Sequence, residues 1–396
     1  MGITLHLFIH NYPIHKKTMM RRIYLIITLV LAVKLLSSFF ANGQNISFSP
    51  KIKADNNTEI NEIVDVWKNY IKACVIDFIN PEDSTSLSFW NIEERVAGRS
   101  DLIKYSLSRG FPLYIAGDLF VYDIKYISND FYIIKNIISH SDSLGKNIFA
   151  IFNICARKAE TDFKLYNFFH LSSSKLNIYT KQNITFYYSC DFKFDERIAD
   201  KAAAFYQDKL KLFDFEGKSI MYILGESVDE AKSYLGFDYS IKSTSIENAG
   251  LFIYPNIILT GEIDHYHELI HSIFIPKFPK AHSLLHEGIA TYFGGSNGKS
   301  YIHHLKELSK YINTNPSIDL SQFEKLDYFR NNTTNFYYTI GAIIIDYAYS
   351  LGGKNKVISL FEHTNFYDAL RIELGIEEHQ INDFLRNFVI KNESTY

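Results

Sequence analysis

The five residues from His267 to His271, HELIH, limit what this chain can fold into more than any other stretch. Histidines four positions apart leave the same face of an α-helix one turn apart, so both imidazoles can bind one metal ion. Glu268 lies next to that face, too far round the helix to be a third ligand but well placed to accept a proton from a metal-bound water. The stretch therefore predicts a helix in which both histidines hold a zinc ion (Zn2+) and Glu268 is the catalytic base.

Polar residues and prolines should mark the ends of this helix. Thr260 is expected to cap its first turn, where the positive end of the helix dipole would stabilise Glu262 and Asp264. The helix is expected to end near Phe274, because Pro276 prevents its continuation.

A catalytic zinc ion needs a third protein ligand, and Glu287 in HEGIATYF is the candidate. A second helix from about His282 to Phe293, running antiparallel across the turn IPKFPKAH, would bring Glu287 back beside the two histidines. Gly288 would leave space for a close approach of the helices. His286 and His282 remain alternative third ligands.

At these residues the chain resembles the gluzincin metallopeptidases, in particular the aminopeptidase-N-like and peptidase MA-like group. In that family the HExxH helix is followed by a helix with a motif close to NEGFAxY, and the stretch His286–Tyr292 is similar. A later Tyr-x-x-Gly-Ala, whose tyrosine steadies the tetrahedral oxyanion, corresponds to YTIGA from Tyr338 to Ala342. The family's Glu-Asn-Trp-Gly-Leu, on the edge strand that lines the cleft, corresponds to ENAGL from Glu247 to Leu251.

The resemblance, which covers about residues 183–385, implies a complete hydrolytic site. Its residues would be the zinc ligands His267, His271 and Glu287, the general base Glu268 and the oxyanion donor Tyr338. Ala249 stands where the family's edge motif has tryptophan. The resemblance therefore implies zinc and water chemistry on a peptide bond, without the exopeptidase specificity of the aminopeptidases.

Other side chains near these motifs also have ordinary structural explanations. Tyr338 and its neighbour Tyr337 could be core residues of an amphipathic helix, and Glu247 a surface carboxylate at the end of a strand. Thr291 could hydrogen-bond a metal ligand or simply pack. Three further histidines have no identifiable partner and are expected on the surface: His265, His303 and His304.

Length and composition are typical of a globular chain with two domains, with 396 residues of which 47% are hydrophobic and 21% charged. Helical spacing over residues 57–79 is followed by the strand-like segments FYIIKNIIS, NIFAIFNICA and FKLYNFFHLS. A helix followed by antiparallel strands predicts a small N-terminal α+β domain over residues 45–177, similar to the NTF2-like cone.

The second predicted domain covers residues 178–396. Its first part alternates the strands NITFYYS, SIMYIL and LFIYPNIIL with helices at 196–213 and 228–235, and the chain after Gly261 has almost wholly helical patterns. Gly352 and Gly353 are expected to end a helix. The predicted fold class is therefore α+β, with a zincin-type catalytic domain made of a sheet subdomain and a helical subdomain, and the HELIH motif at their junction.

The N-terminus predicts export. Two arginines precede the apolar run Ile23–Val33, which indicates a signal over residues 1–43, starting at Met19 or Met20 and leaving Gln44 as the first mature residue. An uncleaved membrane anchor is the alternative, although the run is shorter than the roughly 20 residues that a span needs. The expected location is the periplasm, the cell envelope or the outside of the cell.

The cysteines and the net charge limit the disulfide bonds and the binding partners that can be expected. Cys74, Cys155 and Cys190 are too few for a disulfide framework, so free thiols are expected, with a Cys155–Cys190 bridge as the alternative. The net charge of −3, with both signs scattered, gives no basic face for nucleic acid. The expected partner is a peptide or protein substrate.

Together these features predict an exported zinc metallopeptidase. The alternative is a cell-envelope binding or structural protein that keeps the peptidase fold without activity. The presence of Glu268 favours the enzyme, because an inactive relative would be expected to lose its general base first.

Overall fold

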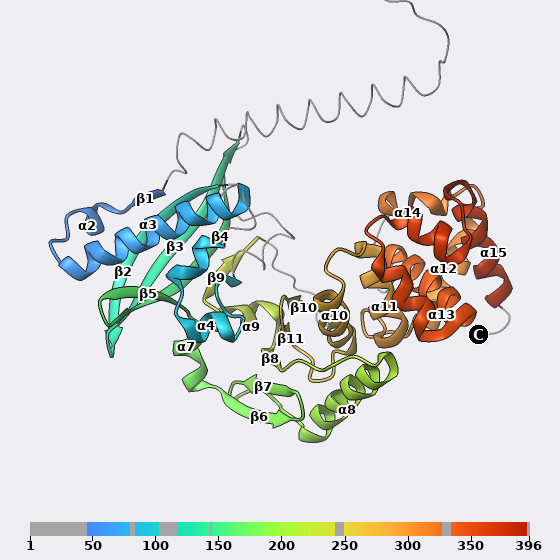
Figure 1. Ribbon diagram of the computed structural model, residues 1–396, viewed down its shortest axis with the longest axis horizontal. Helices are drawn as coiled ribbons and strands as arrows, with labels where there is room; N and C mark the ends of the chain where they lie inside the picture. The colour runs from blue at the N-terminus through green and yellow to red at the C-terminus, as the bar shows by residue number, and fades with distance from the viewer. Residues whose placement is uncertain are drawn as a thin grey trace, which may run out of the picture.

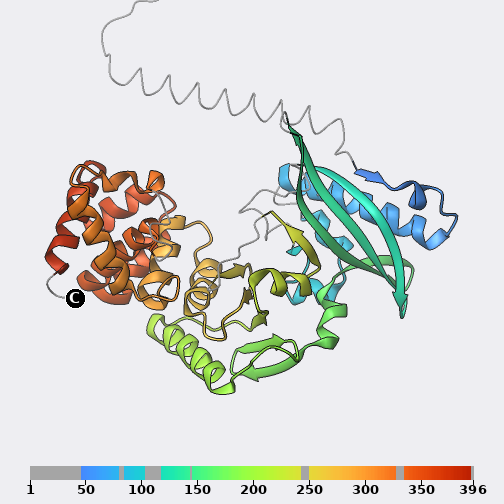
Figure 2. The same cartoon turned by 180° about the vertical axis from the view of Figure 1, so that it is seen from behind.

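The computed structural model describes residues 46–79, 84–102, 117–142, 145–241, 249–326 and 334–393. Within these residues an N-terminal sheet, a second sheet and a group of helices follow one another from one end of the molecule to the other (Figure 1 and Figure 2). The α+β class predicted from the sequence is therefore confirmed. The segment 1–43, predicted to be an export signal, and Glu247 lie outside the described residues.

The N-terminal sheet, sheet A, is built from long antiparallel strands with a helix on one face. Its strands are β1 (Ile46–Phe48), β2 (Asp118–Ser128), β3 (Phe131–Asp142), β4 (Gly145–Ala159) and β5 (Asp162–Asn167), in that order, with β9 (Phe237–Ser240) paired to β4. The covering helix α3 (Thr58–Ile79) buries Trp67 and Tyr70 completely. The helix and the strands expected in this half of the chain are thus present, together with the short α2 (Pro50–Lys53), η1 (Thr85–Phe89) and α4 (Ile92–Val96).

The second sheet, sheet B, has a parallel centre. Its strands are β10 (Gly250–Ile253), β11 (Ile257–Thr260), β8 (Ile220–Leu224), β7 (Ile184–Tyr188) and β6 (Asn177–Lys181), in that spatial order. The neighbours β7, β8 and β11 run parallel, while β10 and β6 are antiparallel edge strands. The helix α8 (Glu196–Phe213) connects β7 to β8, and α9 (Val228–Tyr234) follows β8.

Sheet B separates two hydrophobic cores, as the central strand β8 shows. All five of its side chains are buried, which is typical of a parallel strand covered on both faces. Tyr222 and Leu224 belong to the core shared with the helices, whereas Met221 and Ile223 belong to the core shared with sheet A. The chain beyond residue 178 therefore contributes to the N-terminal core, and through β9 also to sheet A.

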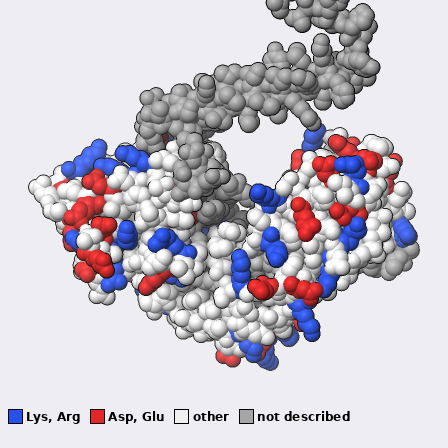
Figure 3. All heavy atoms as spheres, viewed as in Figure 1, with Lys and Arg blue, Asp and Glu red and all other residues white. Residues whose placement is uncertain are grey.

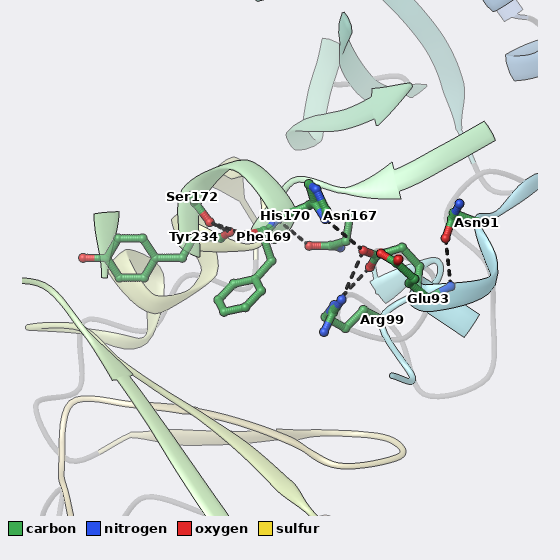
Figure 4. Close-up of polar contacts among 9 residues, drawn as sticks. Asn91, Glu93, Arg99, Asn167, Phe169, His170, Ser172 and Tyr234 are labelled. Carbon is green, nitrogen blue, oxygen red and sulfur yellow. Dashed lines mark hydrogen bonds and ion pairs between the residues drawn. The ribbon is translucent and has the colours of Figure 1, made fainter. Parts of the chain in front are cut away.

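A buried carboxylate lies between α4 and the loop that follows it. The Glu94 side chain is fully buried and accepts hydrogen bonds from two nitrogens of Arg99, at 3.1 and 3.2 Å. Its Oε1 also lies 3.8 Å from Nδ1 of His170 on α7 (Phe169–Ser172), and Figure 4 labels both partners, Arg99 and His170. In the loop after α4, Gly98 touches the turn between β10 and β11, since a Cβ on Gly98 would lie 2.6 Å from Cγ of Pro255. The N-terminal half of the molecule thus packs directly on the β10–β11 hairpin.

The described part of the chain after β11 is mainly helical. It consists of α10 (Tyr266–Lys277), α11 (Ser283–Gly294), α12 (Tyr301–Thr314), η3 (Leu320–Lys325), α13 (Phe336–Glu362), α14 (Phe366–Ala369), η4 (Leu370–Leu374), η5 (Glu378–Gln380) and α15 (Ile381–Glu393). None of the helices in the described part of the chain combines the length and the apolar character that crossing a membrane requires. On the face in Figure 3, acidic and basic side chains are interspersed, as the scattered charges of the sequence indicated.

Several local predictions were wrong. Thr260 ends β11 instead of capping the HELIH helix, and its hydroxyl accepts the N–H of Glu262 at 3.1 Å in a turn. The helix begins only at Tyr266, and Pro276 lies within its last turn. The segment LFIYPNIIL is divided by a turn into β10 and β11, and FKLYNFFHLS is strand only as far as Asn167.

Two other expectations concern Gly352–Gly353 and the cysteines. The pair Gly352 and Gly353 has non-helical backbone angles, so a helical stretch ends there as expected, and a second stretch follows within the range of α13. The alternative of a Cys155–Cys190 bridge was wrong, because both thiols are free. Cys155 is buried in sheet A, and this burial raises the pKa of its thiol, whereas Cys190 is exposed.

Candidate metal centre

The helices α10 and α11 form a hairpin that brings His267, His271 and Glu287 together. The Nε2 atoms of the two histidines lie 3.0 Å apart. Oε2 of Glu287 lies 3.3 Å from Nε2 of His267 and 3.4 Å from Nε2 of His271. All three side chains are buried. The three atoms therefore converge on one point inside the hairpin.

This spacing fits a tetrahedral zinc site. Ligand atoms about 2.0–2.2 Å from a zinc ion lie about 3.3–3.6 Å from one another at the corners of a tetrahedron. The distances of 3.0, 3.3 and 3.4 Å in the hairpin are close to this range. Two imidazoles and one carboxylate are also a donor set that catalytic zinc uses, with the fourth position left for water or substrate.

Hydrogen bonding prepares His267 to act as a ligand. Its Nδ1–H donates to the carbonyl of Gly295 at 2.7 Å, so Nε2 of the neutral ring presents a lone pair toward Glu287. A lone pair facing a carboxylate in a buried space is unfavourable unless a positive charge lies between them. Either a proton or a metal ion could supply that charge, and the donor set suits a metal ion.

The pKa values of His267 and Glu287 also indicate that the site favours a positive charge. Burial works to lower the pKa of His267, but the hydrogen bond that its protonated Nε2 donates to Glu287 and the negative charges of Glu268 and Glu287 outweigh it and raise the pKa. Burial works to raise the pKa of Glu287, but the positive charge of His271 and the hydrogen bonds that the two imidazoles donate when protonated hold it well below the usual range. The site thus keeps Glu287 ionised and stabilises a cation beside it.

Glu268 is a second buried carboxylate at the same place. The ligand atoms of His267, Glu268 and His271 all lie within 4.8 Å of one another, a looser group than the one that includes Glu287. The side chain of Glu268 packs against Gly250, the first residue of the edge strand β10, since a Cβ on Gly250 would lie 2.4 Å from Cγ of Glu268. Glu268 therefore lies between the histidines and the edge strand, beside the tighter ligand set.

Tyr338, the expected oxyanion donor, also lies at the site. Its ring stacks on the ring of His267, with centroids 5.6 Å apart and planes 20° from parallel. The neighbouring Tyr337 is bound elsewhere, because its hydroxyl is hydrogen-bonded to the hydroxyl of Ser283 at 2.7 Å. Tyr338 thus contacts a candidate ligand.

The glycines of the two motifs HEGIATYF and YTIGA have a shared structural reason. Gly288 on α11 faces Gly341 on α13, and a Cβ on Gly288 would lie 2.3 Å from the carbonyl carbon of Gly341. The helices can cross this closely only because both residues lack side chains. The crossing carries Tyr338, one turn before Gly341, to the ring of His267.

The alternative third ligands lie outside the site. Nε2 of His286 bonds to the carbonyl of Phe278 at 3.1 Å. His282 caps α11, where its Nδ1 accepts the N–H of Leu284 at 3.2 Å. Among the described residues, Glu287 is thus the side chain of α11 that contacts both histidines.

Two histidines expected on the surface are instead near the site. His304 is completely buried. His265 is half-buried, and its Nε2 would lie 2.8 Å from a Cβ on Gly250, beside Glu268. Thr291 is fully buried on α11, and its carbonyl accepts the N–H of Gly295 at 3.0 Å.

Comparison with known proteins gives little further information. No protein-family model and no curated protein sequence matches this chain. Among solved structures, the chain is similar to the M1 zinc metallopeptidase from Deinococcus radiodurans, with 13% identity over 72% of this chain and 69% of that chain and a TM-score of 0.34. The likeness is distant, and what the centre can do follows from its own residues.

Proposed function

We propose that this protein is a zinc metallopeptidase of the gluzincin type, with His267, His271 and Glu287 as the metal ligands. One observation carries the proposal: two imidazole nitrogens and a carboxylate oxygen lie within 3.4 Å of one another in a buried helix hairpin. A second buried carboxylate, Glu268, lies beside them and gives the centre a base as well as a ligand set.

In the proposed reaction, zinc supplies the electrophilic chemistry, because when bound it lowers the pKa of water toward about 7 and polarises a carbonyl oxygen. Glu268 accepts a proton from the water while the water oxygen attacks the carbonyl carbon of the peptide bond. When the carbon–nitrogen bond breaks, Glu268 passes that proton to the leaving amine. The hydroxyl of Tyr338 donates a hydrogen bond to the oxyanion that forms between these two steps.

The residues around His267 and Glu268 support the roles proposed for these two side chains. The carbonyl of Gly295 holds the proton of His267 on Nδ1, which keeps Nε2 available as a ligand atom. Gly250 leaves room for the side chain of Glu268 beside the edge strand β10, and we propose that a peptide substrate binds along this strand. The proposed substrates are therefore peptides or proteins.

The test of this proposal is the metal content and activity of the purified protein. We expect one zinc ion per chain by mass spectrometry and cleavage of members of a broad peptide library. His271→Ala should abolish zinc binding because a site with two protein ligands rarely holds zinc. His286→Gln, the matched change at a neighbouring histidine, should retain it.

Three results would speak against the proposal in different ways. Stoichiometric zinc in His271→Ala would rule out the ligand set. Loss of zinc in His286→Gln would move the third ligand to that histidine. Zinc binding without cleavage of any peptide would favour the inactive binding or structural protein.

We also propose that the protein is exported, with a signal over residues 1–43, an N-terminal domain over 45–177 and a peptidase domain over 178–396. The two arginines and the apolar run that ends at Val33 motivate this. N-terminal sequencing of the exported protein should begin close to Gln44. A chain that retains Arg21 would instead be anchored in a membrane through its N-terminal segment.

A further inference from the structure

The turn after α11 lies directly on the first turn of the HELIH helix. A Cβ on Gly294 would lie 2.6 Å from the backbone nitrogen of His267, so the two backbones are in contact there. Gly295 follows with a φ of +78°, and a Cβ on it would lie 2.4 Å from the carbonyl oxygen of Lys299. Both glycines are needed to bring the Gly295 carbonyl to Nδ1 of His267, 2.7 Å away.

A tight turn continues from this contact. Ser296 and Lys299 exchange two backbone hydrogen bonds, each 2.9 Å long. Between them Asn297 and Gly298 both have positive φ, at 49° and 66°. This is the type I′ turn that an Asn-Gly pair favours. The sequence thus specifies the shape of the segment that carries the Gly295 carbonyl.

The buried histidine of α12 holds this turn. Nε2 of His304 lies 2.9 Å from the carbonyl oxygen of Ser296, and Nδ1 lies 3.2 Å from the hydroxyl of Thr334. A carbonyl can only accept, so Nε2 carries the proton and Nδ1 accepts from the hydroxyl. Burial lowers the pKa of His304, which favours this neutral form.

The second contact of His304 leads to the other side of His267. Thr334 precedes Asn335, the residue that caps α13 by accepting the N–H of Tyr338 at 3.3 Å. The ring of Tyr338 in turn stacks on the ring of His267. His304 therefore hydrogen-bonds to both segments that contact His267. The segment at Ser296 carries the Gly295 carbonyl that accepts from Nδ1 of His267. The segment at Thr334 leads to Tyr338, whose ring stacks on the imidazole of His267.

We propose that His304 is a positioning residue of the metal centre, which fixes the orientation of His267 through Ser296 on one side and Thr334 on the other. The inference rests on the proposed function, since it gives His267 the role of a zinc ligand. Partners that orient a ligating imidazole typically contribute about 10- to 100-fold to metal affinity. His304 acts one contact further away, so we expect an effect near the lower end, about tenfold.

A role confined to core packing would give a different result. A packing residue stabilises the protein equally with and without zinc, so its loss lowers both melting temperatures and leaves the rate of zinc release unchanged. A positioning residue weakens zinc binding itself. Its loss therefore also reduces the increase in melting temperature that zinc produces, because that increase depends on the ratio of zinc concentration to Kd.

The test measures zinc release from the full-length protein into an excess of a coloured chelator. His304→Leu removes both hydrogen bonds and should release zinc about tenfold faster than the wild type. His304→Gln can still donate from its amide to the Ser296 carbonyl and should restore most of the difference. His303→Leu makes the same change at the neighbouring position, which lacks these two contacts, and should release zinc at the wild-type rate.

The outcomes separate this inference from the proposed function. Wild-type protein that takes up no zinc would overturn both. Wild-type protein that binds zinc, with His304→Leu releasing it at the same rate, would overturn only the positioning role. If His304→Leu does not fold, Thr334→Val decides, because it removes one of the two contacts without changing side-chain shape. Faster release from Thr334→Val supports the role, and release from Thr334→Val at the wild-type rate overturns it.

Discussion

Replacing Glu268 with glutamine should leave zinc content close to that of the wild type while peptide hydrolysis falls by about 10²–10⁴-fold. Glutamine has the same shape as glutamate, so it can occupy the buried space beside Gly250 without disturbing the helix hairpin. Its amide, however, cannot accept the proton of the attacking water. Zinc by mass spectrometry and turnover of a cleaved library peptide, measured on both proteins side by side, check the prediction.

The matched control is Glu262→Gln, the same chemical change in the loop before α10. Glu262 precedes the first residue of α10, Tyr266, and has no proposed role in the reaction, so turnover should stay near the wild-type value. Equal turnover in Glu268→Gln and the wild type would mean that another group activates the water. Loss of zinc in Glu268→Gln would mean that this carboxylate is a ligand rather than the base.

The features that could be predicted from sequence depend on local periodicity and capping. The helix predicted over residues 196–213 is α8, which begins after Asp195, whose side chain accepts the N–H of Arg197, and ends at Asp214 with a positive φ of 54°. The approach of His267 to His271 likewise follows from helix geometry alone. These predictions require information only about residues that are close together along the chain.

The failed predictions depend on segments that are distant in sequence. Thr260 has the side chain of a helix cap, but strand pairing between β11 and β8 extends to it and delays the helix to Tyr266. Nothing in the local sequence of Phe237–Ser240 indicates that β9 pairs with β4 in sheet A and not with a strand of sheet B. The contact of Gly250 with Glu268 similarly exists only after sheet B and α10 have packed together.

His304 is a different case, because a sequence signal for its burial was present. Tyr301, Leu305, Leu308 and Ile312 form one apolar stripe of α12, and all four are buried. His304 lies on that stripe at helical spacing, whereas His303 lies beside it. A histidine on the buried face of an amphipathic helix should therefore have been expected to have polar partners in the interior.

Glu287→Gln should have the opposite effect to Glu268→Gln: it should weaken zinc binding strongly. Loss of an outer hydrogen-bond partner of a ligand costs about 10- to 100-fold in metal affinity, so loss of the charged ligand itself should cost more than about 100-fold. The negative charge matters because the carboxylate is what opposes the charge of the ion in a buried space. Competition titration with a chelator of known affinity, on the wild type and both glutamine variants, gives the three affinities.

The comparison is informative because the two carboxylates are chemically identical and differ only in position. Glu287 lies 3.3 and 3.4 Å from the two imidazole nitrogens, whereas the group that contains Glu268 extends to 4.8 Å. If distance from the nitrogens decides which carboxylate binds the ion, only Glu287→Gln loses zinc and only Glu268→Gln keeps zinc without activity. Wild-type affinity in Glu287→Gln, together with zinc loss in Glu268→Gln, would exchange the two roles and leave the centre without its proposed base.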